Sequence, residues 1–488
     1  MPNIALCSEK TMNKKYDFIV LGAGLAGLAF AKRVSENGHS VLVLEKEAVT
    51  GGLSRTIKHN GFYLDFCAHR FHTNNETLLN EILALDGFSM KKHLKKSRIY
   101  MFDKYLKYPF QLQNLLRAMP IAKCITCSLS FLINLIKKNF QDKEKIRSYK
   151  DWFVYFYGKS LYEVMCRPYT SKVWRTDPSL ISADWAEERF QGEKIIYLIK
   201  RVFTKLLTFD FSGYSIEDEE HIPDGGYFYY PQKGIQELPD ALAAASTSHG
   251  AAIRTDSTID HIERDSKAVV FVDNKTGQTD TAHYSYLIST IPLNNFYDLQ
   301  DHKDTGIAAD IHNLVYMNII FVFAFLSRDK ISNDHWLYFP DNRILFNRGV
   351  EFSNWSPIMC PQGKTSVCFD ITCYHDSDIW RSSDEEIATT VLNDADRINY
   401  IKSADVESYY VYRLKYAYPF YDLDYKRKLD NVVRFFERDG CCLLGRTGMF
   451  RYNNADNSME MGFALAENFL KKNENPSIYD YKIKHISL

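Results

Sequence analysis

The sequence predicts an α/β fold in which one domain is assembled from separated stretches of the chain. A strand, a glycine-rich turn, a helix and a second strand follow one another over residues 16–45. Mostly helical sequence occupies 112–166, and apolar segments typical of an antiparallel sheet occupy 314–374. A short strand and a helix follow from residue 442, where the first domain is expected to return.

The first stretch has the spacing of a dinucleotide-binding turn. The apolar strand at 18–21 leads into glycines at G-x-G-x-x-G spacing, namely Gly22, Gly24 and Gly27. They permit a tight turn, a close approach of backbone to a pyrophosphate, and packing of helix on strand. The helix predicted at 25–37 offers free N–H groups to the phosphates. Glu45 ends the second strand and can accept hydrogen bonds from a ribose diol.

A second glycine pair favours FAD over NAD. The segment after the Glu45 loop reads Gly51-Gly52-Leu53-Ser54-Arg55. Its glycines let the backbone meet another part of a long cofactor, and Arg55 can face the phosphates or the flavin edge. The alternative is a plain loop that carries two glycines.

The sequence therefore predicts a discontinuous Rossmann-type FAD-binding domain, a helical insertion and an antiparallel-sheet substrate domain. We expect the three FAD-binding parts at 16–85, 225–290 and 436–475. The mainly helical substrate or oligomerisation domain is expected at 86–215, with a mobile acidic loop at 210–226. The antiparallel substrate domain is expected at 291–435.

Bulk properties exclude some classes of protein. A chain of 488 residues is long enough for two or three domains, and its net charge of −1 gives no global basic field for nucleic acid. C-x-x-C pairs do not recur at zinc spacing, so we expect no metal site. The ten cysteines are interpreted as reduced thiols of a cytoplasmic protein. The first fifteen residues are expected to be a disordered lead.

The apolar run at 121–136 contains lysine and several polar residues, so it falls short of a transmembrane segment. A buried or oligomer-facing helix is favoured over an interfacial membrane helix, and a homo-oligomer is one possible assembly.

Two further segments carry candidate site residues. His69 follows a predicted hairpin and could lie over an isoalloxazine ring, although a lone histidine is more often structural. Tyr108 and Phe110 flank Pro109 and could sandwich a planar base, with Gln111 bonding its edge. The alternative for this second segment is a proline-capped helix entry.

Several motifs in order resemble the UDP-galactopyranose mutase family, particularly its longer, eukaryotic-type form, within the amine-oxidase-like FAD superfamily. They include Y-P-F-Q at 108–111, R-P-Y-T-S-K-V-W at 167–174 and F-S-N-W-S-P at 352–357. The spacing from Tyr338 to Arg348 and a closing G-R with Tyr452 also match. The resemblance covers residues 16–470.

The resemblance implies roles for individual residues. It places uracil against Tyr108, Phe110 and Gln111, and the nucleotide or sugar against Thr170 and Trp174. It implies that the diphosphate is held by Arg189, Arg348, Tyr338, Tyr418 and Tyr452. It implies that the flavin and sugar lie near His69, Gly445, Arg446, Asn454, Asn457, Ser458 and Met459. Of these residues, His69, Arg189, Arg348 and Arg446 would be catalytic.

The implied enzyme is an isomerase that interconverts pyranose and furanose forms of a UDP-sugar, as in galactofuranose and polysaccharide biosynthesis. It would use reduced FAD, with NAD(P)H or another donor as reductant, and a flavin N5–sugar adduct. Where the family has Gly-Gly before the histidine, this chain has Cys67-Ala68, and Thr170 replaces an asparagine. The sugar and nucleotide therefore stay open. The alternatives are a flavin oxidase or desaturase of the amine-oxidase or protoporphyrinogen-oxidase type, and a flavoprotein that binds without turnover.

Overall fold

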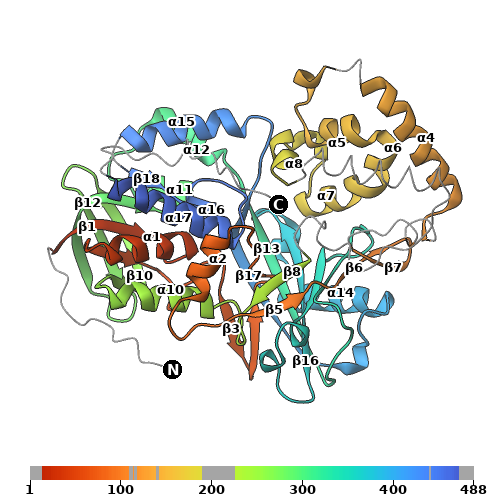
Figure 1. The fold of residues 1–488 in the computed structure, drawn as a ribbon, viewed down its shortest axis with the longest axis horizontal. Coiled ribbons are helices and arrows are strands. Elements are labelled where there is room, and N and C mark those ends of the chain that lie inside the picture. Colours follow the sequence, from red (N-terminus) through yellow and green to blue (C-terminus); the bar gives the residue numbers. More distant parts are fainter. Residues whose placement is uncertain are drawn as a thin grey trace.

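The computed structural model describes residues 14–108, 114, 118–138, 142–189, 226–438 and 441–471. These residues form two seven-stranded sheets, with a separate group of helices at one end (Figure 1). The predicted α/β fold is confirmed. Residues 1–13 of the expected disordered lead, most of the expected acidic loop, and Phe110 with Gln111 lie outside the described residues. The prediction was wrong for the last two residues of the lead, because Lys14 and Lys15 pair with β12 as the start of β1.

The first sheet is centred on β1 (Lys14–Leu21), which lies parallel to β2 (Val41–Leu44) and β12 (Thr279–Ser289). Four further strands, drawn from distant parts of the chain, complete it: β9 (Ala252–Arg254), β10 (Ser257–Glu263), β11 (Ala268–Asp273) and β18 (Cys441–Leu443). The discontinuity of this domain thus has a simple cause, because neighbouring parallel strands come from separate segments.

Helix α1 (Leu25–Glu36) packs between this sheet and two other helices, α10 (Glu237–Ser248) and α17 (Ala455–Leu470). Glycines set how closely these elements approach. A Cβ on Gly27 would lie 2.5 Å from the carbonyl oxygen of Gly22, and one on Gly462 would lie 2.4 Å from that of Ala26. The turn and both helices can therefore keep their positions only without these side chains.

The second sheet is antiparallel apart from one pair and runs in the order β17-β13-β16-β15-β14-β6-β7. The strands are β6 (Ser97–Met101), β7 (Lys104–Lys107), β13 (Tyr316–Leu326), β14 (Trp336–Tyr338), β15 (Arg348–Glu351), β16 (Thr365–Cys373) and β17 (Val406–Pro419). The segment 97–107 therefore belongs to this sheet, although we expected it in the mainly helical domain. It joins because β6 pairs in parallel with β14.

Strand β13 explains the longest apolar run of the chain, since all of its residues are buried. Alternate side chains face opposite sides of a strand. Phe321, Phe323 and Phe325 pack in the core shared with the first sheet. Ile320 and Val322 pack in a second core, with residues of α14 (Asp384–Arg397).

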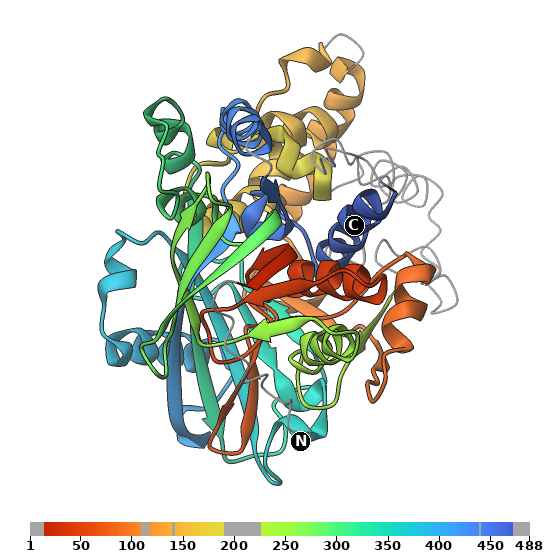
Figure 2. The ribbon, with the colours of Figure 1, turned by 90° about the vertical axis from the view of Figure 1, so that its left-hand side faces the viewer.

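The helical group comprises α4 (Ile121–Lys137), α5 (Tyr149–Tyr157), α6 (Lys159–Leu161), η3 (Tyr162–Cys166), α7 (Arg167–Trp174), η4 (Pro178–Leu180) and α8 (Ala183–Arg189). It lies at one end of the molecule, where α7 contacts β16 of the second sheet (Figures 1 and 2). The run 121–136 does form a helix, but its aliphatic face is exposed in the single chain. No helix of the described ranges is long and apolar enough to cross a membrane.

The remaining elements connect or cover these parts. The strands are β3 (Thr56–His59), β4 (Phe62–Asp65), β5 (Lys91–Leu94) and β8 (Tyr227–Tyr230). The helices are α2 (Glu76–Leu83), α11 (Leu293–Asp298), α12 (Thr305–His312), α13 (Asp378–Arg381), α15 (Tyr425–Arg438) and α16 (Gly445–Gly448). Short single turns are η2 (Lys143–Lys145), η6 (Phe352–Asn354), η7 (Pro357–Met359) and η8 (Ser403–Asp405).

We expect Gly462→Ala to destabilise the protein by about 1–3 kcal/mol, because the added Cβ overpacks the contact between α1 and α17. In a free helix the same change would stabilise by about 1 kcal/mol. Asn468→Ala, in the same helix, is the control and should change stability by less than about 0.5 kcal/mol. Chemical unfolding of the three proteins measures both changes. A more stable Gly462→Ala protein would contradict the tight helix contact.

Candidate active site

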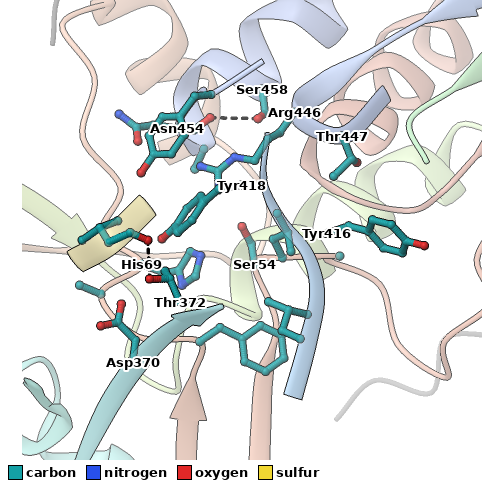
Figure 3. Close-up of a pocket in the computed structure, with 18 of the residues that line it drawn as sticks. Ser54, His69, Asp370, Thr372, Tyr416, Tyr418, Arg446, Thr447, Asn454 and Ser458 are labelled. Atoms are coloured by element: carbon teal, nitrogen blue, oxygen red, sulfur yellow. Dashed lines mark hydrogen bonds between the residues drawn. The ribbon is translucent and has the colours of Figure 1, made fainter. Parts of the chain in front are cut away.

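A cavity of about 1670 Å³ opens where the carboxyl ends of β1, β2 and β12 face the second sheet (Figure 3). Its lining includes the turn after β1, the end of β2, and residues of β14 to β17. In open α/β sheets, ligands bind beyond the carboxyl ends of the strands. The cavity thus lies where the sequence predicts the cofactor.

The turn between β1 and α1 leaves room for a phosphate group. Gly24 precedes the first residue of α1, and no side chain caps this helix end. A Cβ on Gly24 would meet nothing within 4 Å, so the space beside it is open. Gly22 has φ +98°, and a Cβ there would lie 2.4 Å from Oγ1 of Thr290. The uncapped N–H groups therefore face open space that suits a pyrophosphate.

Glu45 lies at the end of β2 and is held by backbone N–H groups. Oε2 accepts from the N–H of Ala23 at 2.9 Å, and Oε1 accepts from that of Glu47 at 3.0 Å. Burial raises the pKa of Glu45, although the two hydrogen bonds oppose this shift. Each oxygen keeps an acceptor site for a ribose hydroxyl.

The second glycine pair lies against the first turn. Gly51 forms an isolated bridge with Gly24, and a Cβ on Gly52 would lie 3.3 Å from the Cα of Gly24. Arg55 donates to the carbonyl of Gly52 at 2.9 Å and pairs with Glu47 at 2.9 Å. Leu53, Ser54 and Arg55 all line the cavity. The predicted segment therefore lies beside the turn after β1 and Glu45, and together these residues form the cofactor cradle.

The last strand and helix return to this cradle. Gly445, with φ +78°, and Arg446 line the cavity where α16 begins. Asn454 precedes α17, and Oγ of Ser458 donates to its carbonyl oxygen at 2.9 Å (Figure 3). Of the predicted residues in this segment, Asn457 also lines the cavity, whereas Met459 is fully buried behind the wall.

One cross-strand row of the second sheet forms the polar floor. Tyr338 pairs with Arg348, and Arg348 pairs with Asp370, so the three side chains share one face. Nε of Arg348 donates to Oδ2 of Asp370 at 2.7 Å, and Nη2 donates to the hydroxyl of Tyr418 at 3.2 Å. The guanidinium is thereby fixed at the cavity floor.

Tyr418 reaches this row because β17 is irregular near its end. The register against β13 shifts between Met317 and Ile319, and Tyr416 has φ +57°. The side chain of Asn318 accepts from the N–H of Tyr416 at 3.2 Å and supports the bulge. Bulges of this kind re-aim side chains next to functional sites.

Arg446 lies beside two phenol rings. Its guanidinium carbon is 5.5 Å from the ring centre of Tyr418 and 5.3 Å from that of Tyr452. Carbonyl oxygens of Asn453 and Ala417 accept from it, the first at 2.9 Å from Nε. No carboxylate of the described residues forms an ion pair with Arg446, so its charge is not neutralised there.

His69 is a neutral imidazole in this site. Burial, together with the charges of Arg446 and Arg348, lowers the pKa of His69 to about 3. Its Nδ1 atom is buried and has no hydrogen-bond partner among the described residues. It can therefore donate or accept a hydrogen bond at neutral pH but does not carry a charge.

The loop before His69 is strained where the resembled family has glycine. Cys67 has φ +68°, which costs about 1–2 kcal/mol for a residue other than glycine. Its side chain is buried against the thiol of Cys368. The side chain is thus held in place, which opposes rearrangement of this loop.

The structure does not bring every predicted residue to the cavity. Trp174 is buried behind the wall, where its ring contacts Trp185 and Tyr452, so it supports the site without lining it. Thr170 lines the cavity, with its hydroxyl bonded to that of Tyr149 at 3.0 Å. Tyr108 lines it too, 5.1 Å from the ring of Tyr338. The side chain of Arg189 lies outside the described residues.

The sequence analysis did not identify two residues of the candidate active site, Asp370 and Tyr169. Asp370 is an acid within an otherwise uncharged buried strand, and that anomaly was a usable signal. Tyr169 lies inside the quoted R-P-Y motif and faces Arg348 and Tyr338. Lys172 of the same motif donates to the carbonyls of Phe339 and Phe346, each at 2.6 Å, and so fastens α7 to the loop between β14 and β15.

Unpartnered polar atoms gather around the cavity. Buried atoms with no hydrogen-bond partner among the described residues occur on the lining residues His69, Tyr157, Trp336, Asn347, Asp370 and Asp456. Buried polar groups normally have partners. A polar ligand in the cavity would supply them, and the glycine cradle is shaped for a dinucleotide cofactor.

Comparison with known proteins identifies the family. The family model described as "Flavin containing amine oxidoreductase" matches residues 25–426, which is most of the chain. The chain therefore belongs to this family of flavin enzymes. The flavin implied by this membership fits the residues present: uncapped α1, Glu45, the second glycine pair and the orphaned His69 nitrogen.

Individual relatives within this fold catalyse different reactions. Protoporphyrinogen oxidase 2 of Arabidopsis thaliana is 22% identical over 481 residues, 92% of this chain and 91% of the relative. A probable UDP-galactopyranose mutase of Klebsiella pneumoniae is 27% identical over 176 residues, 35% of this chain and 44% of that protein. A crystal structure of reduced UDP-galactopyranose mutase has a TM-score of 0.80 at 21% identity, covering 97% of this chain and 99% of that one. The last likeness shows the shared fold.

We expect His69 to make stability depend on pH. Below the ordinary pKa of 6.5 the unfolded histidine binds a proton, whereas the folded one stays neutral down to about 3. His69 should therefore make stability rise with pH across this interval, by at most about 1.4 kcal/mol per pH unit, and His69→Gln should remove this contribution and leave that of His335, whose pKa burial also lowers. Chemical unfolding of both proteins over a pH series measures the difference.

His261→Gln is the control, because exposed His261 has its pKa raised by Asp260 and Glu263. The contribution of His261 is present at low pH and is lost as pH rises, which is the opposite sign. Equal pH dependence in wild type and His69→Gln would show that His69 is not buried as a neutral group.

Proposed function

We propose that this protein is an FAD-dependent mutase that interconverts the pyranose and furanose forms of a UDP-sugar. The observation that carries the proposal is the polar row in which Arg348 is held between Tyr338 and Asp370 and contacts Tyr418. A fixed guanidinium matches phosphate oxygens through its fork of N–H donors, and phenol hydroxyl groups complete the set. A diphosphate beside a flavin is the ligand that this arrangement suits.

Charge favours the mutase over an oxidase of apolar substrates. A buried cation is costly unless an anion compensates it. Arg348 has Asp370, but Arg446 is bound only by carbonyl oxygens and phenol rings in the described part of the chain. A UDP diphosphate would supply the missing negative charge, whereas an amine substrate would not.

When bound in this cavity, a reduced flavin would supply the nucleophile for the anomeric carbon of the sugar. The chain itself binds and orients the nucleotide. Arg348 and Arg446 stabilise the charge that develops on UDP as it departs, and they keep UDP in place for its return. Neutral His69 would hydrogen-bond the flavin or sugar through its unpartnered Nδ1 atom and would not act as an acid.

We further propose a cytoplasmic location and a place in galactofuranose or polysaccharide biosynthesis, with NAD(P)H or another donor as reductant. The nine cysteines of the described residues are free thiols, which suits a reducing compartment.

The reaction is tested anaerobically. The purified protein is reduced with dithionite and given UDP-galactopyranose or UDP-galactofuranose, and the products are separated by chromatography. We expect interconversion with reduced flavin and none with oxidised flavin. Oxidised protein is the control for the reductant. Tight UDP binding without turnover would indicate another sugar, and absence of UDP binding would favour the oxidase.

We expect the double variant Arg348→Gln/Asp370→Asn to weaken UDP binding about 10–100-fold, because charge-assisted bonds to phosphate are lost. Removing both charges avoids leaving Asp370 buried without its partner. Arg98→Gln/Asp334→Asn is the matched control, since that pair has a 2.6 Å contact next to the same sheet and its members do not line the cavity. Titration calorimetry with UDP measures binding, and flavin absorbance shows that the cofactor site is intact. Equal affinities would remove the diphosphate assignment.

A further inference from the structure

The outer face of α4 is a continuous aliphatic surface. Six side chains of this helix are between 47% and 78% exposed: Ile121, Ile125, Leu129, Leu132, Ile133 and Ile136. At 3.6 residues per turn, they fall within about 120° of arc on one face. Contiguous exposed aliphatic groups on a folded protein mark a surface that binds something.

The opposite face of α4 already has its partners within the chain. Cys127, Phe131 and Asn134 are buried. Asn134 donates to the carbonyl of Tyr155 at 2.8 Å, and Oγ of Ser130 accepts from the N–H of Ser160 at 3.2 Å. The helix is therefore anchored on α5 and α6, and the aliphatic face remains outward.

The sequence around α4 is strongly basic. Residues 118–150, which include α4 and the segment directly after it, contain seven Lys and Arg residues against two Asp and Glu residues, a net charge of +5 in a chain whose net charge is −1. Lys123 and Lys137 on α4, and Lys143 and Lys145 just after it, are exposed. No acidic residue occurs within α4.

We propose that α4 docks this protein on the surface of an anionic lipid bilayer. The six aliphatic side chains would enter the boundary between headgroups and acyl chains, while the lysines contact lipid phosphates. The helix of 17 residues is about 25 Å long and would lie flat in the interface. It stands at the outer edge of the molecule, where neither sheet lies in front of it (Figure 1).

Charge also argues against a second copy as the occupant. A twofold dimer through α4 would place the same face of each subunit against the other. Two segments of net charge +5 would then face each other, and their repulsion opposes such a contact. An anionic bilayer complements both the apolar face and the charge.

Vesicle co-sedimentation of the full-length protein tests the proposal. Vesicles of phosphatidylcholine alone are compared with vesicles that also contain phosphatidylglycerol, at low and high salt. We expect binding to the anionic vesicles that weakens with salt, and little binding to the zwitterionic ones.

The triple variant Ile125→Gln/Leu129→Gln/Ile136→Gln should bind anionic vesicles about tenfold or more weakly. The matched control is Leu180→Gln/Ile358→Gln/Leu423→Gln, which changes side chains that are 54%, 45% and 40% exposed elsewhere. It should bind like wild type. The variant Lys123→Glu/Lys137→Glu should also weaken binding to anionic vesicles. It tests the proposal even if the triple variant does not fold. Flavin content and the thermal midpoint show that each variant is folded.

Failure of the wild-type protein to bind anionic vesicles would overturn the proposal, and so would equal binding by the α4 triple variant. A dimer that forms without lipid and is abolished by that variant would assign the face to a second copy instead. These outcomes are independent of the proposed mutase reaction, because UDP binding and turnover are not measured in them.

Discussion

The close contact between two glycine turns is the constraint on which the cofactor end of the structure depends. The N–H of Gly51 donates to the carbonyl of Ala23 at 2.8 Å, and the N–H of Ala23 donates to Glu45. Gly52 approaches Gly24 so closely that a Cβ on Gly52 would lie 3.3 Å from the Cα of Gly24. This contact aligns the uncapped helix, the acid and the second loop around one space. A side chain at Gly52 would crowd this contact.

The second sheet supplies charged side chains to the cavity, whereas the turns beside the first sheet supply mainly backbone N–H groups. Tyr338, Arg348 and Asp370 lie side by side only because three antiparallel strands pair in that register. A slip of one residue in any of these strands would turn that strand's side chain to the other face of the sheet. Lys172 holds α7 against the loop that joins two of these strands, and its burial lowers the pKa of this lysine to about 7. The helical group and the sheet therefore position the site together.

Helix α4 connects this interior to the outer surface. Cys124, Cys127 and Ser128 on its inner side line the cavity, whereas its outer side is aliphatic and exposed. One helix thus forms part of the wall of the site and part of a docking surface. The mixture of apolar and polar residues at 121–136 led us to expect a buried or oligomer-facing helix. The structure instead gives the two faces of the helix different environments. The segment that includes α4, residues 118–150, also carries a net charge of +5, although the whole chain has a net charge of −1.

The sequence by itself determined the cofactor cradle, because the roles of Gly22, Gly24 and Gly27 follow from local sterics and their spacing. It also indicated an α/β fold and an antiparallel sheet through apolar periodicity. Only the tertiary structure decided that Asp370 neutralises Arg348, that Trp174 lies behind the wall, and that residues 97–107 join the second sheet. Those outcomes depend on strand register and on packing between segments far apart in the chain, which no local pattern records.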